Sequence, residues 1–71
     1  MKYKVGTLLS LDMNRYIFDT NGKVHSCKSG DLFLITDKVK EDTEYVIVSV
    51  KGFYCNFLYN IAENTFRVID V

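Results

Sequence analysis

The 71 residues of this chain make one small domain, and their composition, with 48% hydrophobic and 25% charged side chains, excludes a disordered polypeptide. Nine basic and nine acidic residues give a formal net charge of zero, so the chain lacks the basic excess that is typical of phosphate-binding proteins. No apolar run approaches the roughly 18 residues of a membrane span, and the N-terminal run is too short for a signal peptide, so we expect a cytoplasmic protein.

Alternating side chains and turn residues predict short strands in the first part of the chain. Residues 3–11 are expected to form a first strand, and residues 15–20 a second with Tyr16 and Phe18 on one face. Asn21-Gly22 is the strongest turn signal in the chain. It predicts either a small hairpin or one long irregular loop, with arms at residues 16–19 and 23–26.

The pattern that follows predicts two further strands and the connections beside them. Four consecutive apolar residues within 32–36 indicate a strand that is buried on both faces or strongly bent, and residues 37–43 read as a polar loop. Residues 62–65 predict a tight connection, at most a single 3₁₀ turn, into a closing strand over residues 66–71. The inward-facing residues of that last strand would be Phe66 and Val68.

The longest continuous signal covers residues 44–61 and predicts one β-hairpin that turns at Lys51-Gly52. Because side chains alternate along a strand, a two-residue loop there directs one set of facing residues to the core. These pairs would be Val50 with Phe53, Val48 with Cys55, Val46 with Phe57, and Glu44 with Tyr59. The outward-facing pairs would be Ser49 with Tyr54, Ile47 with Asn56, and Tyr45 with Leu58.

Five strands in this order, with a long irregular connection after the first and a short turn before the last, resemble the SH3-like barrel. The resemblance implies an all-β fold over residues 1–71, a small five-stranded barrel with at most a single 3₁₀ turn before the last strand. The segments GDLFLIT and YVIVSVKG, in a chain this short, are also similar to those of short early proteins of tailed bacteriophages. That resemblance implies a protein that modulates a host factor in the host cytoplasm. Fold alone does not fix function.

The candidates for metal binding or nucleophilic catalysis are His25, Cys27 and Cys55. A structural zinc site needs four ligands, and a catalytic thiolate needs a third group that orients its base, so this set falls short of both. Two cysteines in a chain without an export signal are interpreted as reduced thiols. We therefore expect no metal, no cofactor, no catalytic residue and no enzymatic activity.

The predicted hairpin register exposes Tyr45, Ile47 and Leu58, which together have the composition of an interface core with an aromatic anchor. Lys51 and Tyr54 would lie at its edge. These residues predict a non-enzymatic protein-binding module whose partner is a host factor or a second copy of the chain. The alternative interpretation is that the N-terminal segment covers this face.

A second function class is the binding of single-stranded RNA or DNA. Small barrels bind single strands by stacking bases on exposed aromatic rings beside basic side chains. The candidate residues are Arg15, Tyr16, Lys23 and Lys28. The zero net charge favours the protein-binding interpretation over this one.

Overall fold

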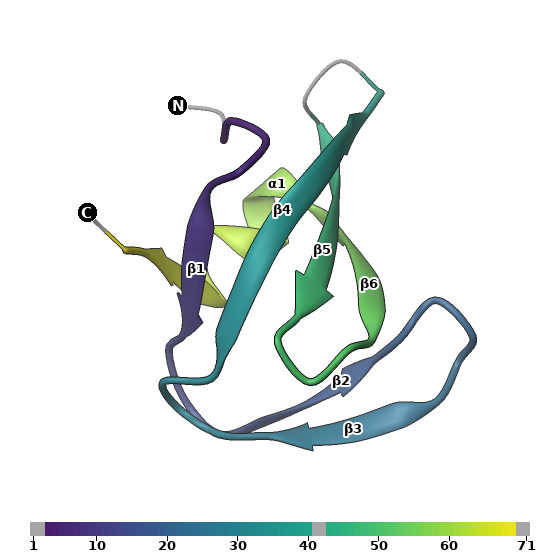
Figure 1. Cartoon of the computed structure of the whole chain (residues 1–71), viewed down its shortest axis with the longest axis vertical. Helices are drawn as coiled ribbons and strands as arrows, with labels where there is room; N and C mark the ends of the chain where they lie inside the picture. Colours follow the sequence, from purple (N-terminus) through teal and green to yellow (C-terminus); the bar gives the residue numbers. More distant parts are fainter. Residues whose placement is uncertain (1–2, 41–42, 70–71) are drawn as a thin grey trace.

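The residues that the structure describes, 3–40 and 43–69, form seven strands and one helical turn in this computed structural model (Figure 1). The elements are β1 (Leu8–Leu11), β2 (Arg15–Phe18), β3 (Val24–Cys27), β4 (Leu32–Val39), β5 (Glu44–Ser49), β6 (Tyr54–Leu58), α1 (Tyr59–Ala62) and β7 (Phe66–Val68). The predicted small all-β domain is confirmed.

The strands form two antiparallel sheets. The main sheet has the order β6-β5-β4-β1-β7, and β2 pairs with β3 alone in a hairpin that we call the arm. The arm lies across one end of the main sheet (Figure 1). It replaces the irregular connection of the predicted five-stranded barrel, and it brings the number of described strands to seven. Within the described residues no ladder joins β6 to β7, so hydrogen-bonded strands do not close the main sheet.

The β5–β6 hairpin differs from the predicted register by one residue. Ile47 pairs with Cys55, and the Ser49 N–H donates to the Phe53 carbonyl at 2.8 Å, so the loop contains three residues instead of two. The loop closes through the Gly52 N–H, which donates to the Ser49 carbonyl at 2.8 Å. Gly52 has a φ of +100°, the left-handed conformation that ends a common three-residue hairpin loop.

This shift exchanges the two faces of β5. Tyr45 and Ile47 are fully buried and Ser49 is buried beside them, whereas Val46 and Val48 are only partly buried. The buried polar atoms find partners: the Tyr45 hydroxyl accepts a hydrogen bond from the Tyr3 N–H at 3.1 Å, and Ser49 Oγ accepts one from the Lys51 N–H at 3.0 Å. A tyrosine can therefore occupy the core without an unsatisfied hydroxyl.

The core is formed mainly by side chains of the main sheet, together with Ile17 and Cys27 of the arm and Ala62 of α1. Aromatic rings meet within it, with Phe33 and Phe66 5.0 Å apart and Phe57 and Phe66 5.2 Å apart, measured between ring centroids. The buried hydrophobic residues are Leu9, Leu11, Ile17, Cys27, Phe33, Ile35, Tyr45, Ile47, Phe53, Cys55, Ala62 and Phe66.

Strand β4 is longer than predicted and contains an irregularity. Its ladder with β5 shifts between Ile35 and Asp37, so the extra residue Thr36 forms a bulge. The apolar run before the bulge alternates, with Phe33 and Ile35 fully buried, Leu32 partly buried and Leu34 exposed, so the predicted burial on both faces is wrong. The predicted polar loop over 37–43 is shorter, because β4 continues to Val39; residues 41–42 lie outside the described residues.

The predicted first and last strands are both shortened. A turn at Gly6, in which the Thr7 N–H donates to the Lys4 carbonyl at 3.0 Å, delays the start of β1 to Leu8. The helical turn before the last strand covers Tyr59–Ala62 instead of residues 62–65. In β7, Phe66 is buried as predicted but Val68 is half exposed, and residues 70–71 lie outside the described residues.

The arm confirms the hairpin predicted at Asn21-Gly22. Asp19 organises its tip: Oδ1 accepts the N–H groups of Asn21 and Lys23 at 2.8 and 3.0 Å, and Oδ2 accepts His25 Nε2–H at 2.8 Å. The bond from His25 and these backbone donors lower the pKa of Asp19. The His25 ring in turn stacks on Phe53, with ring centroids 3.8 Å apart, and so holds the arm against the main sheet.

Candidate binding groove

The docking face predicted around Tyr45, Ile47 and Leu58 does not exist. Tyr45 and Ile47 point into the core because of the one-residue change in the hairpin register, and only Leu58 is exposed. Tyr54 is exposed as expected. Lys51 is also exposed, and its Nζ forms an ion pair with Asp31 at 3.3 Å.

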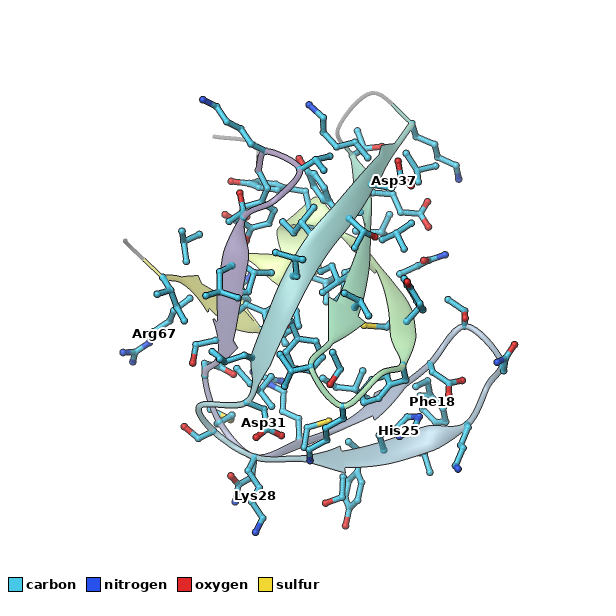
Figure 2. All side chains as sticks on the ribbon, viewed as in Figure 1. Phe18, His25, Lys28, Asp31, Asp37 and Arg67 are labelled. Carbon is cyan, nitrogen blue, oxygen red and sulfur yellow. The ribbon has the colours of Figure 1, made fainter. Side chains whose placement is uncertain are left out.

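Arg15 does not share a surface with Tyr16, although both are among the four residues predicted for nucleic-acid binding. Arg15 forms a bidentate pair with Asp12, through Nε at 3.0 Å and Nη2 at 3.1 Å, so its charge is already compensated. Tyr16 is 77% exposed and lies on the opposite face of the arm, because side chains alternate along β2. Lys23 and Lys28 flank β3 at its two ends, and Lys28 points away from the main sheet (Figure 2).

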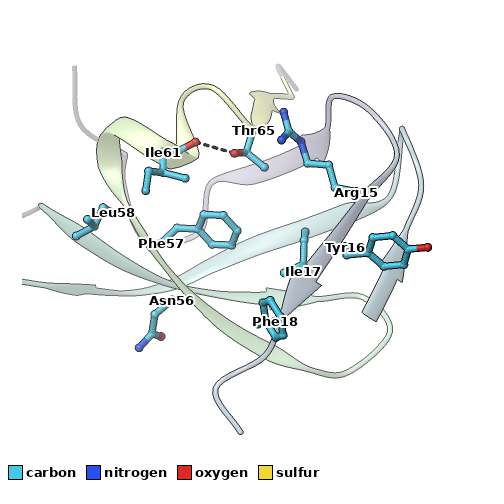
Figure 3. Close-up of a pocket in the computed structure, with 9 residues that line it drawn as sticks. All are labelled: Arg15, Tyr16, Ile17, Phe18, Asn56, Phe57, Leu58, Ile61 and Thr65. Carbon is cyan, nitrogen blue, oxygen red and sulfur yellow. Dashed lines mark hydrogen bonds between the residues drawn. The ribbon is translucent and has the colours of Figure 1, made fainter. Parts of the chain in front are cut away.

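A groove of about 400 Å³ lies between β2, β6 and α1 (Figure 3). Ile17 and Phe57 point into it from β2 and β6, and Ile61 closes one end from α1. Most of its large side chains are apolar, and several of them are exposed. The lining residues are Arg15, Tyr16, Ile17, Phe18, Asn56, Phe57, Leu58, Ile61 and Thr65.

Exposed apolar side chains are concentrated along this groove. Phe18 is 67% exposed, and Leu58 and Ile61 are about half exposed. Single exposed apolar residues are normal on a protein surface, but several beside one hollow are typical of a binding site. Tyr16, next to them, adds an amphipathic ring of the kind enriched at protein interfaces.

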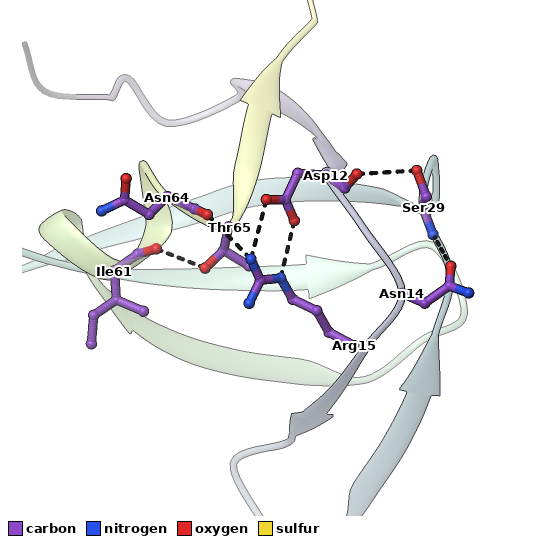
Figure 4. A network of polar contacts seen from close by, with 7 residues as sticks. All are labelled: Asp12, Asn14, Arg15, Ser29, Ile61, Asn64 and Thr65. Carbon is purple, nitrogen blue, oxygen red and sulfur yellow. Dashed lines mark hydrogen bonds and ion pairs between the residues drawn. The ribbon is translucent and has the colours of Figure 1, made fainter.

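The polar end of the groove is held by hydrogen bonds (Figure 4). Arg15 Nη2 also donates to the Asn64 carbonyl at 3.3 Å, which links β2 to the segment before β7. The hydrogen bond from Arg15 lowers the pKa of Asp12, and the bond to Asp12 raises the pKa of Arg15, so both groups stay charged near neutral pH. Thr65 Oγ1 donates to the Ile61 carbonyl at 2.7 Å. This end of the groove is therefore fixed and carries little net charge.

The residues considered for metal binding and catalysis are not arranged for either. Within residues 3–40 and 43–69, no group of three or more His, Cys, Asp or Glu side chains could hold a metal ion. Cys27 and Cys55 are free and buried. Burial raises the pKa of Cys55 to about 12 and also raises that of Cys27, which keeps both thiols protonated at neutral pH.

Sequence reasoning found part of the groove and missed most of it. Arg15, Tyr16 and Leu58 were proposed for other surfaces, and Phe18 was placed correctly on the face of Tyr16. The groove residues that were not proposed are Ile17, Asn56, Phe57, Ile61 and Thr65. The available signal was the apolar pattern of the RYIF segment, which gives β2 one buried residue between two exposed aromatic ones.

Comparisons with known proteins give no assignment. No protein-family model matches the chain, and neither the curated proteins nor the solved structures contain a match. In the part of the chain that the structure describes, no helix has the length and apolar character needed to cross a membrane.

Proposed function

We propose that this domain is a non-enzymatic protein-binding module that holds a segment of another protein in the groove between β2, β6 and α1. The observation that carries this proposal is the row of exposed apolar side chains along a hollow whose inner residues, Ile17 and Phe57, are already packed against the core. Such a hollow offers a partner apolar contact area without any rearrangement of the core.

The strand order supports an SH3-like architecture as the framework of this module. The arm lies between β1 and β4, where the resemblance implies a long irregular connection, and the helical turn Tyr59–Ala62 precedes β7. The likeness of the sequence to short bacteriophage early proteins adds a host protein in the host cytoplasm as the proposed partner. Binding in the groove between β2, β6 and α1 requires neither the SH3-like architecture nor a bacteriophage origin.

The test compares groove variants with variants that match them in exposure. Phe18→Ser and Ile61→Ser remove apolar side chains that are 67% and 50% exposed at the groove, and Val50→Ser and Val68→Ser remove side chains of the same exposure elsewhere. A library of displayed random peptides is selected on the wild-type domain, and each binder is measured on all four variants. Binding should fall at least about tenfold in the groove variants only. Equal losses in both pairs, or no loss, would reject the groove.

Single-stranded nucleic acid is the second candidate, because Tyr16 and Phe18 lie exposed on one face of β2 and Lys23 and Lys28 flank the neighbouring strand. Two aromatic rings beside two cations are the elements of a base-stacking surface. Titration with mixed-sequence single-stranded DNA and RNA at low and moderate salt tests it. Tight binding that weakens steeply with salt would favour this function over peptide capture.

A further inference from the structure

We propose that the segment held in the groove is an extended, uncharged strand that pairs through its backbone with the outer edge of β2. This inference depends on the proposed function and specifies the chemistry of the partner. It follows from the direction of the backbone groups along β2, from the side chains of the groove and from the charges at its end.

The outer edge of β2 presents to the groove backbone groups that belong to no ladder within the described residues. Hydrogen-bonded residues alternate along an antiparallel ladder, and the Asp19 N–H donates to the Lys23 carbonyl at 2.8 Å across the arm. By this alternation Ile17 also faces β3, whereas Tyr16 and Phe18 direct their N–H and C=O groups outward. Within the described residues, β2 forms a ladder with β3 alone, so neither residue belongs to a ladder outside the arm.

Thr20, two positions after Phe18, shows which way the outer edge of the arm faces. The Thr20 N–H donates to the Tyr54 carbonyl at 2.8 Å, so the outer edge of the arm meets β6 at one point. Farther from the tip, the described residues contain no ladder between β2 and β6, and the groove lies between the two strands. A bound strand would satisfy the groups that separate there, which is the usual mode of β-strand addition.

The edge of β6 offers fewer groups. The ladder bonds of β6 involve Phe53, through its carbonyl, and Tyr59, whose N–H donates to the Thr43 carbonyl at 2.9 Å. By the same alternation, the backbone groups of Asn56 and Leu58 face the groove. Leu58, however, is the N-cap residue of α1, and the carbonyl of an N-cap residue accepts the first hydrogen bond of its helix. Two adjacent outward residues on β2 therefore make it the better pairing edge.

The residues that line the groove also determine which side chains the bound strand should carry. Side chains of a strand added to β2 would alternate between the face of Ile17 and the face of Tyr16 and Phe18. On the first face they would meet Phe57 and Ile61, so every second position should be apolar. The positions between them would lie beside the exposed aromatic rings and remain partly in solvent.

The charges of the groove match a neutral partner. Arg15 is the charged residue among those that line it, and Asp12 compensates that charge through two hydrogen bonds. A charged side chain in the bound segment would lose hydration and gain no free counter-charge. The bound strand should therefore be uncharged over the residues that enter the groove.

The experiment uses a displayed library of random heptapeptides, followed by synthesis of the best binders. Each peptide is prepared with and without N-methyl groups at alternate backbone nitrogens, and amide hydrogen exchange of the domain is followed by NMR. We expect neutral peptides with apolar residues at every second position. These peptides should slow amide exchange at Tyr16 and Phe18 but not at Ile17. Alternate backbone nitrogens of a peptide form two sets, the odd-numbered and the even-numbered positions, and N-methylation of one set should weaken binding about tenfold.

The outcomes separate this inference from the proposed function. Binders that depend on Phe18 and Ile61, but carry charged residues or leave exchange at Tyr16 and Phe18 unchanged, would overturn strand addition and retain the groove as a binding site. Strand addition would also be overturned by binders whose affinity is unchanged by N-methylation at the odd-numbered and at the even-numbered positions alike. Binders that are insensitive to both groove variants, or an absence of any binder, would overturn the inference together with the proposed function.

Discussion

Ile47 lies directly opposite Cys55 across the β5–β6 hairpin, and both side chains are fully buried. We expect Ile47→Ser to lower the free energy of unfolding by about 3–5 kcal/mol, because it leaves a cavity and buries a hydroxyl group. That loss is comparable to the whole stability of a domain of this size. Urea unfolding followed by circular dichroism measures it.

The matched change is Leu58→Ser, at the exposed end of the same hairpin. It should cost no more than about 1 kcal/mol. Equal effects of the two substitutions would contradict the observed register, since the alternative register exposes both residues.

The buried thiols should react slowly in the folded protein. With its pKa raised to about 12 by burial, Cys55 at pH 8 carries about one thiolate in ten thousand, against about a quarter in an unfolded chain. Alkylation with iodoacetamide, followed by mass spectrometry of each cysteine, should be slow in buffer and fast in concentrated urea. Rapid labelling of Cys55 in buffer would show that this part of the core opens readily.

Gly52 should resist replacement. An L-residue at a φ of +100° is strained even though nothing lies within 4 Å of the position a Cβ would occupy. Gly52→Ala should therefore lower the free energy of unfolding by about 1 kcal/mol without altering the core. Denaturant unfolding measures the loss, and an increase in stability would argue against the three-residue loop.

Asp19 should make the arm sensitive to acid. Its folded-state pKa lies below the usual value, chiefly because of the hydrogen bond from His25, so the stabilisation is present above about pH 4 and is lost as the pH falls through the folded value. Asp19→Asn should flatten the decline of the unfolding free energy between about pH 5 and pH 2. Denaturant titrations over this range test it, and an unchanged slope would exclude Asp19 as a source of the decline.

The parts of the fold that local patterns control were predictable. Asn21-Gly22 marked the tip of the arm, and alternation placed Tyr16 and Phe18 on one face. The register of β5 and β6 was not predictable in this way, because apolar residues occupy both faces of β5 and either register gives a plausible core. The loop length decided it, through the left-handed conformation of Gly52.

The groove was harder to predict because it is assembled from distant parts of the chain. β2, β6 and α1 meet only after the arm folds against the main sheet, and no local pattern in Asn56, Ile61 or Thr65 indicates that contact. The prediction of exposed Tyr45 and Ile47 failed for the related reason that burial depends on register as well as on hydrophobicity.

The bond between the Thr20 amide and the Tyr54 carbonyl ties the arm to the main sheet near its tip, and Arg15 ties it again near its base through Asn64. With both ends of β2 anchored, the spacing between the two walls is set before any ligand arrives. A bound peptide would then lose its own conformational entropy on docking, while this domain loses almost none. This favours recognition of short linear sequences over large folded surfaces.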